Sequence, residues 1–351
     1  MTAHPKPGNI ETSTPVAGQK VVNLALQGVG SHGGFTWGVL DRLLDEERLA
    51  FDGISATSTG AVNAVLLAYG LAVGGRKAAK EALSRYWRRL AAMASVSIVR
   101  PSLLDKMHGK FGLDYSPGYQ LLDMLSQFCS PYLLNPLNYN PLKALLDEIV
   151  DFELLRRQSV VKLFLCATNV RSGKMKIFGS EELRSEHVLA SSCLPLTMRP
   201  VEIDNEHYWD GAFMGNPPIF PVIYECDASD IILVHVTPSE RLDNPVTPRT
   251  ILDRMQEITF NSTLMREMRV VAFVTQLVDD GKLAGTKRML LHAIEGDDIT
   301  GKLSKSSTMN YDWDFLMHLH SIGREHTDDW IRANFDLLGV ESTIDLHSKY
   351  L

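Results

Sequence analysis

Ser58 lies between a short apolar run at residues 54–57 and a strongly apolar stretch at 59–73. A serine on a sharp strand-to-helix turn exposes its hydroxyl at the helix N-terminus, where it can act as a nucleophile. Such a turn needs small residues two positions away on each side, and Ala56 and Gly60 are small. The first glycine of the common G-x-S-x-G pattern is absent. A serine that merely caps the following helix is the alternative.

A glycine-rich loop, Gly28-Val29-Gly30-Ser31-His32-Gly33, follows an apolar run at 21–27 and precedes a helical pattern at 34–44. Backbone N–H groups in such a loop can hold a phosphate or the oxyanion of a tetrahedral intermediate. The three glycines also match the dinucleotide-binding spacing, so a nicotinamide or flavin enzyme is a further hypothesis. That fingerprint wants an acidic residue at the end of the second strand, whereas Asp52 precedes the predicted strand.

Asp210 stands in an Asp-Gly turn with Gly211, ahead of a Gly/Asn/Pro loop at 215–218. A carboxylate held there could deprotonate a serine hydroxyl, although an ordinary turn is the alternative. His235 is the best histidine for a Ser–Asp–His triad, but we favour a hydrogen-bonded strand histidine. The remaining histidines after Asp210 fall on predicted helices or the tail: His292, His318, His320, His326 and His347. No metal site is expected, because no H-E-x-x-H or cysteine cluster is present.

The elements that must position these residues alternate between strand and helix. Buried strands are predicted at 21–27, 54–57, 160–167, 174–178 and 231–236, and helices at 34–44, 59–73, 77–92 and 313–338. This order is typical of a layered α/β fold. Residues 1–19 form a predicted flexible tail, and 76–150 a helical and irregular insertion. From residue 241 onward the pattern is helical.

The composition bears on three questions: nucleic-acid binding, cellular location and membrane spans. The chain has 351 residues, of which 45% are hydrophobic and 22% charged, and its net charge is -7. This balance gives no reason to expect a nucleic-acid partner. Its four cysteines form no C-x-x-C pair, so a reducing, cytoplasmic location is expected. The longest apolar stretch, 61–73, is too short to span a bilayer.

Taken together, the glycine loop, the serine turn and the Asp-Gly turn resemble the patatin-like phospholipase family. A small-residue and proline block at 190–195 adds to the resemblance, which covers roughly residues 20–240. The resemblance implies a three-layer α/β/α fold with a mostly parallel sheet. It also implies a lipid acyl hydrolase, either a phospholipase or lysophospholipase or an esterase, with a Ser–Asp dyad and no cofactor. Residues 20–240 would then be the hydrolase domain, with a helical region at 241–351 packed on it.

The resemblance also assigns roles. Ser58 would be the nucleophile and Asp210 the base, through a covalent acyl-enzyme. The oxyanion hole would be formed by three backbone N–H groups, those of Gly28, Val29 and Gly30. Four residues would support the site: His32, which braces the glycine loop, Gly33, Gly60 and Gly211.

Two departures from the family pattern keep another reading open. Val29 stands where the family has glycine, and a valine is costly if that position needs a positive φ. Ala56 replaces the elbow glycine. A catalytically weak or dead acyl-lipid-binding protein is therefore the alternative.

The predicted partner is a lipid or acyl-ester substrate, with transient contact to a lipid surface; the oligomeric state has no sequence signal. An acyl-chain tunnel or lid is expected from the insertion and the helices after 241, with a buried core as the alternative. The residues considered for it are Met107, Phe111, Leu121, Met124, Phe128, Met255, Met265 and Met268.

Overall fold

The computed structural model describes residues 18–108, 111–241, 244–283 and 285–350. The predicted flexible tail at 1–19 lies, except for its last two residues, outside that range. The strands are β1 (Lys20–Leu26), β2 (Leu49–Thr57), β3 (Lys162–Asn169), β4 (Met175–Gly179), β5 (Val201–Ile203), β6 (Glu206–Asp210), β7 (Asp230–His235) and β8 (Leu290–Glu295).

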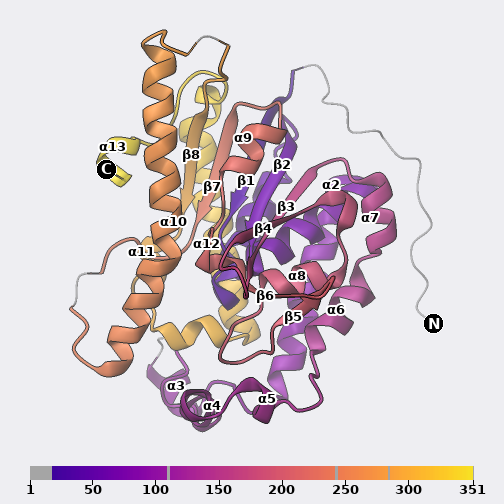
Figure 1. Cartoon of the computed structure of the whole chain (residues 1–351), viewed down its shortest axis with the longest axis vertical. Coiled ribbons are helices and arrows are strands. Elements are labelled where there is room, and N and C mark those ends of the chain that lie inside the picture. The colour runs from indigo at the N-terminus through magenta and orange to yellow at the C-terminus, as the bar shows by residue number, and fades with distance from the viewer. Residues whose placement is uncertain (1–17, 109–110, 242–243, 284, 351) are drawn as a thin grey trace.

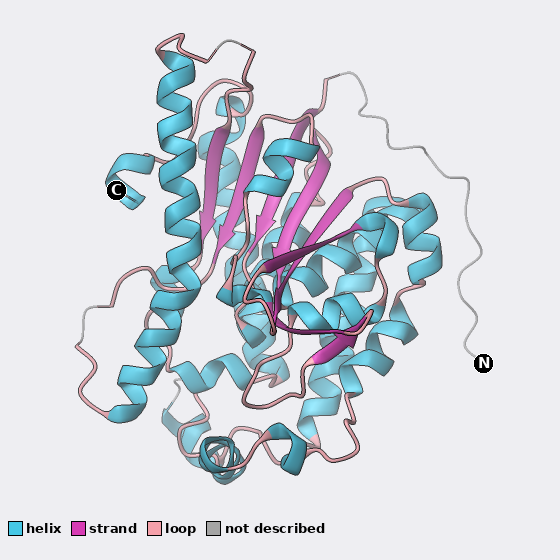
Figure 2. Cartoon of the chain, in the orientation of Figure 1, coloured by secondary structure: helices cyan, strands magenta, loops and turns pink. Residues whose placement is uncertain are grey.

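These strands form one twisted sheet in the order β5-β6-β3-β2-β1-β7-β8, with β4 also paired to β3. Five neighbouring strands run parallel, namely β3, β2, β1, β7 and β8. The other three strands, β4, β5 and β6, are antiparallel to their neighbours. Nearly continuous apolar sequences suit the parallel strands because both faces of such a sheet are covered. The carboxyl ends of these strands point toward the end of the molecule where the short helices of the insertion lie (Figure 2).

Helices cover the sheet and its edges. They are α1 (Gly33–Leu43), α2 (Thr59–Ser95), α3 (Leu103–His108), α4 (Pro117–Phe128), α5 (Pro131–Leu134), α6 (Pro141–Ile149), α7 (Phe152–Gln158), α8 (Ser185–Ser191), α9 (Phe220–Glu225), α10 (Pro248–Asp279), α11 (Asp297–Thr300), α12 (Trp313–Asn334) and α13 (Leu346–Tyr350). Short 3-10 turns are η1 (Gly30–His32), η2 (Ser180–Glu182), η3 (Gly211–Phe213), η4 (Lys305–Met309) and η5 (Phe335–Leu337).

Two hydrophobic cores, one on each face of the sheet, make the fold a three-layer α/β/α sandwich. Successive residues of β1 alternate between them: Leu24 and Leu26 pack with α1, α2 and α12, whereas Ala25 packs with α9 and α10. This alternation is the two-residue period of a strand. Figure 1 shows α9 and α10 on one side of the sheet and α12 on the other. The predicted three-layer architecture with a mostly parallel sheet is confirmed.

The helix after Ser58 folds back on itself. Gly74 and Gly75 break the helical geometry within α2, and Gly75 has a φ of +68°. This break lies where Gly74-Gly75 was predicted to end the first helix. The second half returns alongside the first, because Trp87 Nε1 donates a 3.0 Å hydrogen bond to Asn63 Oδ1. The predicted insertion at 76–150 therefore begins with this returning half of α2, which runs back toward the end of the sheet where Ser58 lies.

The structure corrects two predictions. Residues after 241 are not all helical, because 290–295 form β8 at the edge of the sheet and carry His292. The expected apolar tunnel is also wrong for three of the residues considered, whereas a lid formed by the insertion stays a prediction. Met107 and Phe128 are 81% and 83% exposed, whereas Met268 is buried in the core beneath α10. Within the described part of the chain, no helix combines the length and apolar character needed to cross a bilayer.

Candidate active site

Ser58 occupies the turn between β2 and α2 in a strained backbone conformation. Its φ is 55° and its ψ is -127°, a region that side-chain-bearing residues rarely adopt and that accumulates at functional sites. The Ser58 hydroxyl makes no capping hydrogen bond to α2, so the helix-cap interpretation is wrong. The Ser58 N–H donates to Ser191 Oγ at 2.9 Å, so α8 helps to hold the backbone of this turn.

The serine turn packs tightly against β1. A Cβ at Gly60 would lie 2.7 Å from the Gln27 carbonyl oxygen and would overlap that of Leu26, so the N-terminus of α2 reaches β1 only because residue 60 has no side chain. Ala56 is fully buried in β2 and pairs with Leu26, so alanine is accommodated in place of the elbow glycine.

Asp210 ends β6 and is almost completely buried. Its Oδ1 accepts the Ala212 N–H at 2.8 Å, and its own N–H donates to the Cys193 carbonyl at 2.8 Å. Gly211 lies so close to β3 that a Cβ there would overlap the Cys166 carbonyl oxygen. The carboxylate is thus fixed by both flanking backbone segments.

The structure brings Ser58 and Asp210 together. Burial raises the pKa of Asp210 from 3.8 to about 7, against the opposing effects of hydrogen bonds from the Ala212 N–H and the Ser58 hydroxyl and of the Lys305 charge. Burial dominates because it disfavours the charged form. A carboxyl group with a pKa near neutrality, hydrogen-bonded to a serine hydroxyl, has the properties of a general base.

The glycine loop lies directly beside the serine. A Cβ at Gly28 would overlap both the Thr57 carbonyl and the Ser58 Cβ. The Gly28 N–H, predicted to face an oxyanion, donates to Asn216 Oδ1 at 2.9 Å. Val29 has a φ of -147°, so the valine carries no positive-φ cost, whereas Gly30 has a φ of +54°. The position that needs glycine for its backbone is therefore 30 rather than 29.

His32 connects this loop to η4. Its Nε2 lies 2.7 Å from Ser307 Oγ, and Ser31 Oγ donates to the Ser307 carbonyl at 2.7 Å. Burial, reinforced by the Lys305 and Arg241 charges, lowers the pKa of His32 to about 3, so the ring is neutral at physiological pH. Gly33 follows at the start of α1, where a Cβ would lie 3.0 Å from that of Thr59.

Three residues near the site were missed in the sequence. Asn216 joins the loop after Asp210 to the glycine loop. Its Oδ1 accepts from the Gly28 N–H, and its Nδ2 donates to the Gly28 carbonyl at 3.3 Å. Gln27 donates to the Asn216 carbonyl and accepts from two backbone N–H groups after β7. Lys305 brings a positive charge from η4, which opposes the rise in the pKa of Asp210. A hint existed only for Asn216, which lies in the Gly/Asn/Pro loop already noted.

The histidines considered for a triad lie elsewhere. His235 ends β7, and burial lowers its pKa to about 3; its Nδ1 has no hydrogen-bond partner among the described residues. His292 Nε2 lies 2.9 Å from Asp230 Oδ1. Asp52 lies within β2 and not at its end, where a dinucleotide-binding site would need it. Its Oδ2 accepts hydrogen bonds from the Asp227 and Ala228 N–H groups. Across the described ranges, no group of three or more His, Cys, Asp or Glu side chains is placed to hold a metal ion.

Comparison with known protein families gives a match. The model of the family described as patatin-like phospholipase matches residues 24–223, which contain Ser58 and Asp210. None of the curated proteins matches the chain significantly.

Among solved structures, VipD from Legionella pneumophila is 14% identical, with a TM-score of 0.37 over 92% of this chain and 72% of VipD. The type III effector ExoU is 15% identical, with a TM-score of 0.36 over 89% of this chain and 52% of ExoU. The chain thus spans about half of the ExoU length. With a family match over more than half of its residues, this chain belongs to the patatin-like phospholipase family and is a lipid acyl hydrolase.

Proposed function

We propose that the chain hydrolyses acyl esters of lipids, as a phospholipase, lysophospholipase or esterase, through a Ser58–Asp210 dyad and a covalent acyl-enzyme. The observation that carries this proposal is the Ser58 hydroxyl, which stands on a strained turn and is hydrogen-bonded to a buried carboxyl whose pKa is raised to about 7. A free serine hydroxyl is a poor nucleophile and needs such a base.

In the first step Asp210 accepts the Ser58 hydroxyl proton as the oxygen attacks the ester carbonyl. The negative charge that develops on the carbonyl oxygen would be held by the Val29 and Gly30 N–H groups. The Gly28 N–H serves instead to fix the loop, because it donates to Asn216. Collapse of the intermediate breaks the ester C–O bond, and the proton on Asp210 passes to the departing alcohol.

In the second step a water molecule loses its proton to Asp210 and attacks the acyl carbon on Ser58. The Ser58 oxygen leaves and takes the proton back, which releases the fatty acid and restores the free enzyme. His32 takes no proton in this sequence, because its lowered pKa keeps it neutral and its Nε2 is engaged with Ser307. Its role is to hold the glycine loop against η4.

Contact with a lipid surface is proposed through the short helices of the insertion. On α4, Leu121, Met124 and Phe128 follow one another at helical spacing and are 46%, 52% and 83% exposed. An apolar stripe on an exposed helix is suited to partial insertion at a lipid–water interface. Figure 1 shows α3, α4 and α5 in an arc at the end of the molecule toward which the parallel strands point.

A fluorophosphonate probe, which reacts with activated serines, tests the dyad. We expect wild-type labelling at Ser58, none in Ser58→Ala, and at least a hundredfold slower labelling in Asp210→Asn, since base catalysis contributes about 10²–10⁴-fold. Ser192→Ala is the matched control, because the Ser192 hydroxyl is buried without a hydrogen-bond partner among the described residues. A folded wild type that stays unlabelled would favour the acyl-lipid-binding protein without catalysis.

A further inference from the structure

A cavity of about 980 Å³, partly open to solvent, lies between the returning half of α2, α3 and the segment that leads from η4 into α12. Neither Ser58 nor Asp210 lines it. Its volume is at the upper end of the range of small-molecule sites, and such sites combine apolar walls with a few convergent polar groups. The proposed hydrolysis does not account for it.

The walls of this cavity are largely apolar and aromatic. Ala91 and Ala94 line it from α2, Val99 and Leu103 from the chain leading into α3, and Trp313 from the start of α12. Leu103 is 82% exposed, so the apolar surface continues from the cavity to the outside of the molecule. An acyl or alkyl chain could lie along these side chains and leave the solvent.

Positive charge is concentrated around the same walls. Three cationic side chains, Arg88, Arg100 and Lys106, line the cavity, against the single carboxylate of Asp312. Asp312 lies 3.4 Å from Lys106 Nζ. Among the residues that the structure describes, neither arginine forms an ion pair with a carboxylate.

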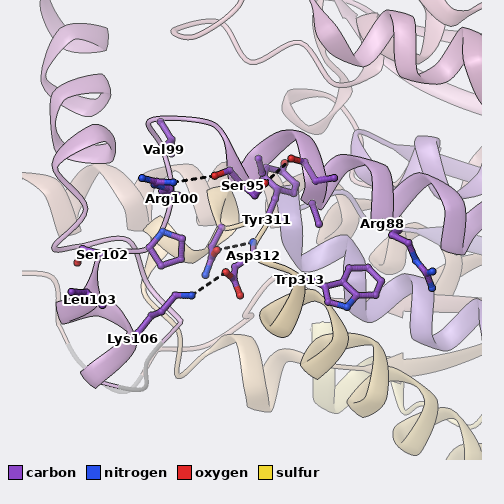
Figure 3. Close-up of a pocket in the computed structure, with 15 residues that line it drawn as sticks. Arg88, Ser95, Val99, Arg100, Ser102, Leu103, Lys106, Tyr311, Asp312 and Trp313 are labelled. Atoms are coloured by element: carbon purple, nitrogen blue, oxygen red, sulfur yellow. Dashed lines mark hydrogen bonds and ion pairs between the residues drawn. The ribbon is translucent and has the colours of Figure 1, made fainter.

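The two arginines are held in place without being neutralised. Arg100 donates to the Ser95 carbonyl at 3.2 Å, and the Arg88 guanidinium lies over the Trp313 ring, 5.5 Å from its centroid. Figure 3 shows Arg100 and Lys106 on one side of the cavity and Arg88 beside Trp313 on the other. Guanidinium groups with unused N–H donors bind carboxylate and phosphate oxygens well.

We propose that this cavity binds a single-chain anionic amphiphile, with its carboxylate or phosphate head at Arg100 beside Lys106 and its chain along the apolar wall toward Trp313. The proposal is independent of the proposed function, since the ligand is defined by the cavity lining and is bound without reaction.

Calorimetric titration of the full-length protein tests this with decanoate, decyl phosphate, decanol and inorganic phosphate. We expect both anionic amphiphiles to bind at least about tenfold more tightly than decanol, as a charge-assisted hydrogen bond allows, and more tightly than inorganic phosphate. If decyl phosphate binds more tightly than decanoate, the natural head is a phosphate; the reverse order indicates a fatty acid.

Arg100→Gln should weaken decanoate binding about tenfold, whereas Arg88→Gln, on the opposite side of the cavity beside Trp313, should weaken it less. Arg157→Gln is the matched control, because this exposed α7 arginine pairs with Glu153 and does not line the cavity. Circular dichroism checks that the variants are folded. Equal affinity for decanol and decanoate, or decanoate binding that Arg100→Gln does not weaken, would overturn the proposal. Fluorophosphonate labelling of Ser58 is measured separately, so failure of one inference does not count against the other.

Discussion

Replacing Asp210 by asparagine should abolish activity and yet stabilise the protein at alkaline pH. The pKa of Asp210 is raised from 3.8 to about 7 by burial. The native state therefore keeps a proton that the unfolded chain loses, and this contribution to stability is lost as the pH rises from about 4 through 7. Asparagine has nearly the same shape and never ionises, so the variant does not suffer that loss.

The magnitude follows from the pKa difference of about three units. Full ionisation of Asp210 costs the native state about 4 kcal/mol, at about 1.36 kcal/mol per unit. Between pH 5 and pH 8 the free energy of unfolding of wild type should fall relative to that of Asp210→Asn by about 2.5 kcal/mol. Solvent does not screen this cost appreciably, because Asp210 is only 1% exposed.

Urea unfolding of both proteins at several values between pH 5 and pH 8 measures this difference. Other titrating groups are common to both proteins and cancel in the comparison. Asp227→Asn is the matched control, because it makes the same substitution at an exposed position. A difference between wild type and Asp210→Asn that stays constant to within about 0.5 kcal/mol would refute the reasoning, given that each pKa unit is worth about 1.36 kcal/mol.

Three further predictions concern the base, the loop and the lipid surface. The rate of fluorophosphonate labelling should rise with pH and reach half its maximum near pH 7, because only ionised Asp210 accepts the serine proton; a flat profile between pH 5 and pH 9 would contradict this. Gly30→Ala should slow labelling at least tenfold and lower stability by about 1–3 kcal/mol, because residue 30 has a φ of +54° and its Cβ would overlap the Thr308 carbonyl; unchanged unfolding and labelling would show that the loop tolerates a side chain. Phe128→Ser should weaken binding to phosphatidylcholine vesicles about tenfold in a flotation assay, as loss of one inserted aromatic side chain implies, whereas Val340→Ser, an exposed control near the C-terminal end, should not.

Much of the fold is readable in the sequence because its signals are local. The turn at Ser58 and the break at Gly74-Gly75 both lie where neighbouring residues alone predict them. β8 was missed because Leu290–Glu295 is a short apolar run, and such a run does not distinguish a strand from a buried helix. Its membership of the sheet is decided by pairing with β7, which is a long-range contact.

The candidate site also has features that could be predicted and features that depend on long-range contacts. The pairing of Ser58 with Asp210 is expected from the family resemblance, whereas the residues alone leave open whether Asp210 is a base or part of an ordinary turn. The partners Asn216 and Ser191 could not be derived, because each acts through one side chain that reaches a distant backbone N–H. The apolar stripe on α4 illustrates another limit: helical periodicity identifies an apolar face but does not say what covers it.

The hydrogen bonds between the glycine loop and η4 have a consequence for the synthesis of the enzyme on the ribosome. His32 and Ser307 are 275 positions apart, and Ser307 lies well beyond the family-matched residues 24–223. A ribosome-bound chain therefore has its serine and aspartate long before it has the segment that braces the loop beside them. We expect hydrolytic activity to arise late in synthesis, so that an incomplete chain does not hydrolyse the lipids around it.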